Sequence, residues 1–200
     1  MIHDTGKNNS HDRLILTLIL LSLAAHVIIF FGPIQSDGAI EMGLAESLIY
    51  KGRFELETLS HGRTHFPPTI PMAIAPFLIT FGFNTLGIHM AQISYFILAL
   101  YICFKLAKEL VPRYAIHITL IYSLDPIIFG SMFGATSEVI LSALILMTTL
   151  SMIRAQKDPR YYIMAGITLA LAYLSKATSL FIALGSITYG AIMIYIIAKR

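Results

Sequence analysis

The sequence predicts an all-α integral membrane protein with about six transmembrane helices and a long extracytoplasmic first loop. Hydrophobic residues make up 56% of the 200-residue chain and only 12% are charged, about half of the ~25% found in soluble domains. The mean hydropathy is +0.76. A soluble domain of this length could not bury so much apolar surface, and the exposed remainder would cause aggregation. The composition therefore excludes a soluble enzyme and a disordered chain.

The first transmembrane helix is predicted over residues 14–31. The polar residues 1–13 precede it, carry Lys7 and Arg13, and are predicted to form a cytoplasmic N-terminus. A cleaved signal peptide is the alternative, but 18 apolar residues are long for its hydrophobic region, and no small-residue cleavage motif follows. We therefore predict a retained signal-anchor.

The remaining spans are predicted within residues 88–200, at 88–106, 114–133, 137–154, 160–175 and 177–198. A further apolar run at 68–83 is shorter and contains prolines, so Lys and Arg counts decide whether it spans. If it does not span, ten of the 14 Lys and Arg residues lie on the cytoplasmic side; if it does, only three do. The charge distribution thus predicts a multi-pass cell-membrane protein with both termini cytoplasmic.

The extracytoplasmic loop over residues 32–87 is too long for a simple connection, and such loops are usually functional. Two short helices are expected in it, near 37–50 and 68–83. In the first, apolar residues recur at helical spacing after a Ser-Asp start that suits a helix cap. The second follows two consecutive prolines and is expected to lie at the membrane interface.

Three ionisable residues stand at the outer ends of apolar helices, where insertion costs roughly 2.5–3.5 kcal/mol and usually marks function. Asp125 precedes a proline, so it is a candidate functional residue or a group that satisfies freed backbone donors. Glu138 is either functional or an acid at a helix start, with Thr136 or Ser137 as the expected cap. Lys176 either snorkels to the lipid headgroups or binds an anionic lipid phosphate.

Two pairs of residues four apart lie in the long loop. Asp37 and Glu41 share one helix face, so they form either a solvated surface or an acid-base site. His61 and His65 lie in a segment that the following prolines and Gly62 mark as loop, and we predict no metal site from them. A need for a divalent cation stays open, and nothing in the sequence resembles a nucleic-acid-binding patch.

The order of these features resembles the GT-C membrane glycosyltransferases, specifically the protein O-mannosyltransferase, aminoarabinose transferase and RgtA-like group. The resemblance covers about residues 10–200 and corresponds to the N-terminal module of the family. The matching segments are Ser36-Asp37-Gly38-Ala39-Ile40-Glu41, His65-Phe66-Pro67-Pro68, Thr136-Ser137-Glu138, Ala165-Gly166-Ile167 and Leu174-Ser175-Lys176.

Members of this family transfer a sugar from a polyprenyl-phosphate carrier to a protein, lipid or glycan acceptor outside the cytoplasm. The resemblance implies that Asp37 is the general base and that Glu138 is a second acid facing the same cavity. It also implies that Lys176 stabilises the charge on the departing carrier phosphate. General chemistry agrees, because a hydroxyl nucleophile needs a base and a phosphate leaving group needs a cation.

The chain departs from the family pattern at several points. Gly38 stands where many relatives carry a second acid, so Glu41 joins the catalytic candidates. His65 lies where aminoarabinose transferases have an acid and a lysine nearby; together with Asp125 and Lys176 it forms the candidate substrate-binding set. Relatives usually continue through further spans, so the chain is expected to be a fragment, a compact variant or a subunit that needs a partner.

Two other classes of protein remain alternatives. A non-catalytic accessory subunit or degenerate relative would not bring Asp37, Glu138 and Lys176 together. A transporter or channel would place polar residues and broken helices near the bilayer midplane, whereas these charges gather at the outer helix ends.

Overall fold

The computed structural model describes residues 13, 16–22, 24, 34, 36–55, 66–176, 181, 184–185 and 188. Within these residues the regular structure is entirely helical, as the composition predicts. The elements are α2 (Ser36–Lys51), α3 (Thr69–Phe81), α4 (Thr85–Leu110), the 3-10 helix η1 (Pro112–Tyr114), α5 (Ala115–Ser123), α6 (Pro126–Gly134), α7 (Glu138–Ala155) and α8 (Tyr161–Tyr173).

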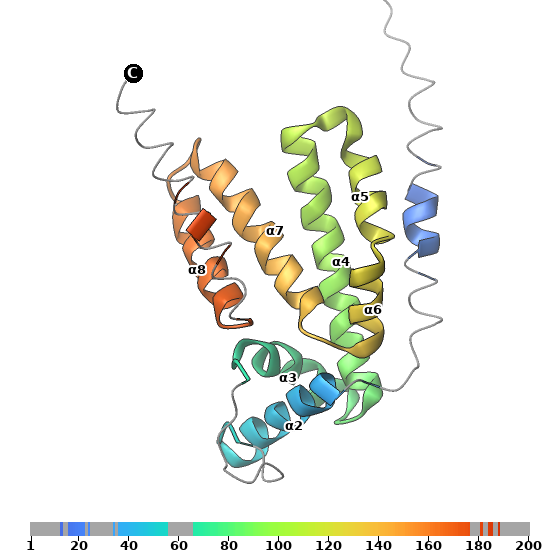
Figure 1. The fold of residues 1–200 in the computed structure, drawn as a ribbon, viewed down its shortest axis with the longest axis vertical. Coiled ribbons are helices and arrows are strands. Elements are labelled where there is room, and N and C mark those ends of the chain that lie inside the picture. Colours follow the sequence, from blue (N-terminus) through green and yellow to red (C-terminus); the bar gives the residue numbers. More distant parts are fainter. Residues whose placement is uncertain are drawn as a thin grey trace, which may run out of the picture.

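The helices form a bundle with one covered end. Helices α4, α5, α7 and α8 run roughly along the long axis of the molecule, while α2 and α3 lie across one end of them (Figure 1). The turns between α4 and α5 and between α7 and α8 form the opposite end. The two ends are called the α2–α3 end and the basic end below, because the second carries Lys108, Arg113 and Lys157.

Membrane-spanning helices are fewer among the described residues than the six predicted. Helices α4 and α7 are long and apolar enough to cross a bilayer, and α5 and α6 would add a third span if they cross as one bent unit. The predicted span at 114–133 corresponds to α5 and α6, whose axes are bent by 50° relative to each other. The break falls at Asp125, since the proline that follows disfavours helical geometry in the residue before it.

The two terminal spans lie mostly outside the described residues. Of the predicted 14–31 span, residues 16–22 and 24 are described, and they are helical. Of 177–198, only residues 181, 184–185 and 188 are described, also as helix. Helix α8 has 13 residues and is apolar but short for a span.

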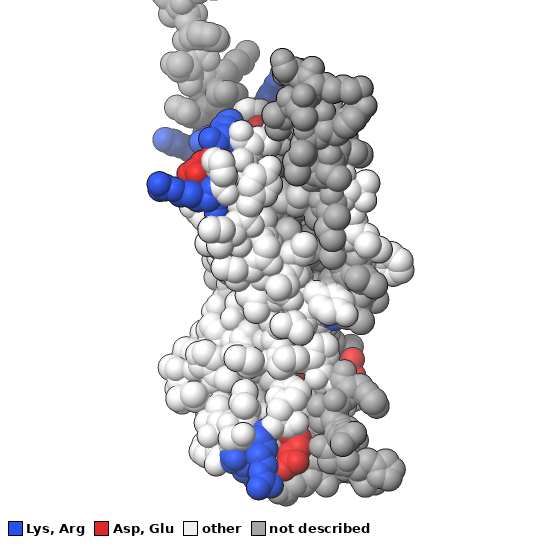
Figure 2. Space-filling model, turned by 90° about the vertical axis from the view of Figure 1, so that its left-hand side faces the viewer, with Lys and Arg blue, Asp and Glu red and all other residues white. Residues whose placement is uncertain are grey.

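The exposed side chains of the bundle are those expected for contact with lipid. Ile121 and Ile127 are each 71% exposed, and Ile163 is 69% exposed; a soluble protein rarely leaves so many large apolar groups in water. Figure 2 shows Lys and Arg side chains gathered at the two ends of one face, with a mostly uncharged surface between them. These features, together with the apolar helices, make this a membrane protein.

The α2–α3 end is joined to the bundle by a continuous apolar core. Leu78 of α3, Ile88 of α4 and Ile140 of α7 are almost fully buried, and Ala45 of α2 packs with them. The Tyr95 hydroxyl of α4 also donates a 3.0 Å hydrogen bond to the Ala73 carbonyl of α3. This packing holds α2 and α3 against the start of α7, where the candidate site lies.

Candidate active site

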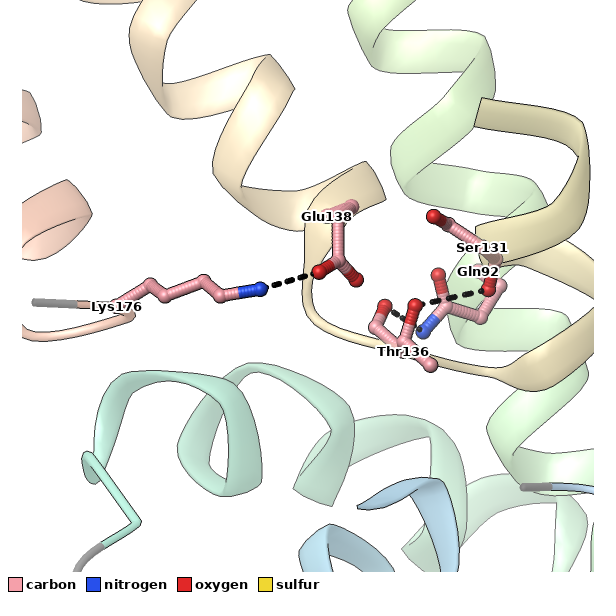
Figure 3. Close-up of polar contacts among 5 residues, drawn as sticks. All are labelled: Gln92, Ser131, Thr136, Glu138 and Lys176. Carbon is pink, nitrogen blue, oxygen red and sulfur yellow. Dashed lines mark hydrogen bonds and ion pairs between the residues drawn. The ribbon is translucent and has the colours of Figure 1, made fainter. Parts of the chain in front are cut away.

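The centre of the candidate site is an ion pair between two of the predicted residues. Glu138 is the first residue of α7, and Lys176 follows the end of α8. The Lys176 ammonium donates a hydrogen bond to Oε1 of Glu138 (Figure 3). The Lys176 side chain is 42% exposed, so the pair is only partly enclosed by the protein.

The turn between α6 and α7 positions Glu138. Ala135 closes α6 in the left-handed conformation, with φ 54° and ψ 41°. The Thr136 N–H then donates 2.9 Å back to the Ser131 carbonyl, a standard way of ending a helix. The chain leaves this turn and starts α7 at once, so the carboxylate lies at the positive end of that helix.

The expected side-chain cap of α7 is absent. Ser137 occupies the cap position in helical geometry and makes no capping hydrogen bond with its side chain. The Thr136 hydroxyl instead donates 3.4 Å to the Ser131 carbonyl (Figure 3). The prediction of Thr136 or Ser137 as a cap is therefore wrong, because Ser137 makes no capping bond and the Thr136 hydroxyl is directed back to the end of α6.

Gln92 is a site residue that the sequence analysis missed. It is fully buried in α4, and its Nε2 donates a 3.2 Å hydrogen bond to the Thr136 carbonyl. Its Oε1 has no hydrogen-bond partner within the described part of the chain. The sequence does contain a signal for Gln92, an amide inside an otherwise apolar helix. Burying an amide is costly unless it is hydrogen-bonded, so such a residue is expected to have a specific polar partner.

Gly38 brings α2 against the same turn. A Cβ at this position would lie 2.8 Å from the Ala135 carbonyl oxygen and 3.1 Å from that of Gly134, closer than carbon and oxygen normally approach. Only glycine therefore allows α2 to contact the turn at this distance. This contact gives a structural reason for glycine where relatives carry a second acid.

Glu41, one turn after Gly38, carries the most perturbed carboxyl of the site. Its side chain is 4% exposed, and Oε2 is buried with no hydrogen-bond partner among the described residues. Burial, with the nearby charges of Asp37 and Glu138, raises the pKa of Glu41 from 4.5 to about 8, while Lys176 opposes the rise. Glu41 is thus predominantly protonated at neutral pH.

The other predicted residues are placed differently. Asp37 is exposed in the first turn of α2, close enough to Glu41 to affect its charge. Asp125 caps α6, accepting hydrogen bonds of 2.8 Å from the Ile127 N–H and 3.3 Å from the Ile128 N–H. This is the structural alternative that the sequence offered for Asp125, a carboxylate that satisfies freed backbone N–H groups. His65 lies outside the described residues, as does His61.

An apolar cavity of about 560 Å³ lies among α3, α4, α7 and α8, which line it. The polar side chains among its lining are those of Thr69, Tyr95 and Thr168. Glu138 and Lys176 do not line the cavity themselves, but Ile140, two residues after Glu138, and Leu174, two residues before Lys176, do. The ion pair therefore lies near an apolar space.

A metal centre finds little support in the described part of the chain. There, no three His, Cys, Asp or Glu side chains come close enough together to hold a metal ion. The site that the described residues build is made of carboxyl groups, one ammonium group and an apolar wall.

The described residues thus combine an acidic loop helix, an ion pair between two helix ends and an apolar cavity. The sequence pattern of the dolichyl-phosphate-mannose-protein mannosyltransferase family matches residues 65–200. The chain belongs to this family, and it is a membrane glycosyltransferase of the GT-C type. No curated protein and no solved structure matches the chain significantly.

Proposed function

We propose that the protein transfers a sugar from a polyprenyl-phosphate carrier to a hydroxyl acceptor at the α2–α3 end. The observation that carries this proposal is the position of the Glu138–Lys176 pair near the apolar cavity. A lipid-phosphate donor has the same two parts, an apolar chain and an anionic head. The family match supports transfer of a sugar in general.

The isoprenoid chain would occupy the apolar cavity. A volume of about 560 Å³ lies within the range of small-molecule pockets and would hold the first part of such a chain. The lining of Met72, Leu98 and Leu171 offers apolar contact with almost no hydrogen-bonding demand. The carrier phosphate would then lie beside the partly exposed Lys176 ammonium.

The reaction itself is an exchange of one bond for another at the sugar. The acceptor hydroxyl oxygen forms a bond to the anomeric carbon from the face opposite the phosphate, while the bond between that carbon and the phosphate oxygen breaks. The hydroxyl proton passes to the Asp37 carboxylate, and the bonding electrons leave with the phosphate. Lys176 stabilises the charge that accumulates on the phosphate, which is where such help lowers the barrier most.

Glu41 and Glu138 have supporting roles in this scheme. Protonated Glu41 is a hydrogen-bond donor rather than a base, so we assign the base to the exposed Asp37. Glu138 holds the Lys176 side chain in place through their ion pair. A positioning contact of this kind keeps the cation near the phosphate before the sugar leaves.

Transfer of labelled mannose from polyprenyl-phosphate mannose in membranes tests the proposal. We expect transfer by the wild type and a loss of about 100-fold or more in Asp37→Asn at equal protein level. Glu46→Gln is the matched control, because Glu46 is an exposed acid of the same helix and carries no assigned role.

The outcomes separate the proposal from its alternatives. Equal transfer by wild type and Asp37→Asn would remove Asp37 from the mechanism and leave the enzyme class standing. A folded wild type that transfers no sugar from any polyprenyl-phosphate donor would favour the accessory-subunit alternative. Activity restored by a co-expressed membrane protein would identify the expected partner subunit.

A further inference from the structure

Two adjoining pockets lie at the basic end, away from the candidate active site. The first, which we call the basic pocket, has a volume of about 240 Å³ and is lined by Phe104, Lys108, Pro112, Arg113 and His117, among others. It lies where α4 ends and α5 begins. Its lining combines two fixed positive charges with an imidazole in a small space.

The second pocket, which we call the apolar groove, has a volume of about 530 Å³. Leu16 and Ile19 of the N-terminal helical segment line one side, and Leu100 and Tyr101 of α4 line another. The Ser22 hydroxyl donates 3.0 Å to the Ser123 carbonyl and holds this segment against α5.

The basic pocket and the apolar groove lie side by side. Phe104 and Ile116 line both of them, so the two spaces share a wall. Arg13 lines the groove and adds a third cation to the group. The Lys105 ammonium lies 5.3 Å from the centre of the Tyr101 ring, beside the groove.

The acidic side chain nearest in sequence does not neutralise these charges. Glu109 accepts hydrogen bonds from Arg154 Nε at 2.7 Å and Nη2 at 2.6 Å, which directs its carboxylate to α7. Among the described residues, no carboxylate lies within ion-pair distance of Lys108 or Arg113. The basic pocket therefore keeps a net positive charge.

We propose that these pockets together bind one anionic phospholipid, with its phosphate in the basic pocket and an acyl chain in the apolar groove. Lys108 and Arg113 would contact the phosphate, since basic pockets between membrane helices suit anionic headgroups. An acyl chain requires an apolar surface beside that headgroup, and the groove supplies it. Neither pocket alone identifies a lipid, but the two side by side match both of its parts.

The site is independent of the proposed sugar transfer. It uses none of the residues assigned to that reaction, and it lies at the opposite end of the bundle (Figure 1). Because the groove is formed partly by the N-terminal segment, a bound lipid would fix that segment against α4 and α5.

Native mass spectrometry of the purified full chain tests the proposal by titration with dioleoyl phosphatidylglycerol and dioleoyl phosphatidylcholine. We expect the wild type to bind phosphatidylglycerol more tightly than phosphatidylcholine. The double variant K108Q/R113Q should lose about 30-fold in affinity for phosphatidylglycerol, in line with the contribution of two cations near a membrane surface. Affinity for phosphatidylcholine should hardly change.

The control is K157Q/R160Q, which removes the same charge from exposed residues at the same end that line neither pocket. We expect it to bind phosphatidylglycerol as the wild type does. A third variant, Leu16→Trp, fills the groove from an exposed position and should weaken binding of the dioleoyl lipid severalfold.

Three results would overturn the proposal. The first is equal affinity for phosphatidylglycerol in the wild type and K108Q/R113Q. The second is an equal loss in K157Q/R160Q, which would indicate a general attraction of anionic lipid to this end. The third is full competition by millimolar inorganic phosphate with no effect of Leu16→Trp, which would make the basic pocket a site for free phosphate.

Discussion

Lys176 and Glu138 pair across 38 residues of sequence and join the end of α8 to the start of α7. Each residue by itself has an ordinary explanation, one as a lysine near the headgroups and the other as an acid at a helix start. The pair lies beside an apolar cavity, which connects both residues to one site. It also gives the mechanism its most direct test.

Exchanging the two residues separates positioning from catalysis. We expect Lys176→Met to reduce sugar transfer by about 100-fold or more, since it removes the cation that would stabilise the leaving phosphate. The exchange E138K/K176E restores opposite charges and should recover much of the thermal stability lost in either single variant. It should leave sugar transfer low, because the lysine then stands on α7 and its ammonium group no longer occupies the position that the end of α8 gives it.

Lys51→Met is the control for the loss of a lysine at the α2–α3 end. Full transfer by Lys176→Met would contradict the assignment of the phosphate contact. Recovery of both stability and transfer in E138K/K176E would show that only the ion pair matters.

The pH dependence of stability should report on Glu41. Its pKa is about 8 in the folded protein, compared with 4.5 without burial. Folding therefore favours the protonated carboxyl, and the free energy of unfolding falls as the pH rises from about 4.5 to about 8. Glu41→Gln removes this dependence, so the variant should unfold roughly 10 °C above the wild type at pH 8 and close to it at pH 5.

Thermal unfolding in detergent at several pH values measures this difference, with Glu46→Gln as the exposed control. If wild type and Glu41→Gln lose stability in parallel as the pH rises, Glu41 does not titrate in this range.

Gly38 should tolerate no side chain. Gly38→Ala places a Cβ 2.8 Å from the Ala135 carbonyl oxygen, so α2 has to move away from the turn, at a cost of about 1–3 kcal/mol. We expect lower thermal stability and reduced sugar transfer, because Glu41 moves with α2. Gly130→Ala is the control, since nothing lies within 4 Å of its Cβ and alanine favours a helix. Equal stability in the two variants would argue against the close contact.

Filling the apolar cavity should weaken binding of the lipid donor. Ala73 is half-buried on the cavity wall, and Ala73→Phe occupies space that the isoprenoid chain would use. We expect the KM for polyprenyl-phosphate mannose to rise severalfold with a smaller change in kcat. Ala170→Phe adds the same bulk to an exposed position of α8, and its kinetics should match the wild type. A wild-type KM in Ala73→Phe would place the donor elsewhere.

The sequence by itself determined the class of the protein. A hydrophobic content of 56% with few charges leaves a helical membrane protein as the physical solution, because lipid cannot satisfy exposed backbone groups. The short motifs around Asp37, Glu138 and Lys176 also pointed to the glycosyltransferase group that the family match then identified. Composition and the order of motifs are properties of the linear sequence, so they are available without the three-dimensional structure.

Only the tertiary structure decided which of these residues meet. It paired Lys176 with Glu138, buried Glu41 and brought Gln92 to the turn before α7. It also brought Gly38 of α2 against the end of α6. These are contacts between segments far apart in the chain, and helical periodicity does not specify them.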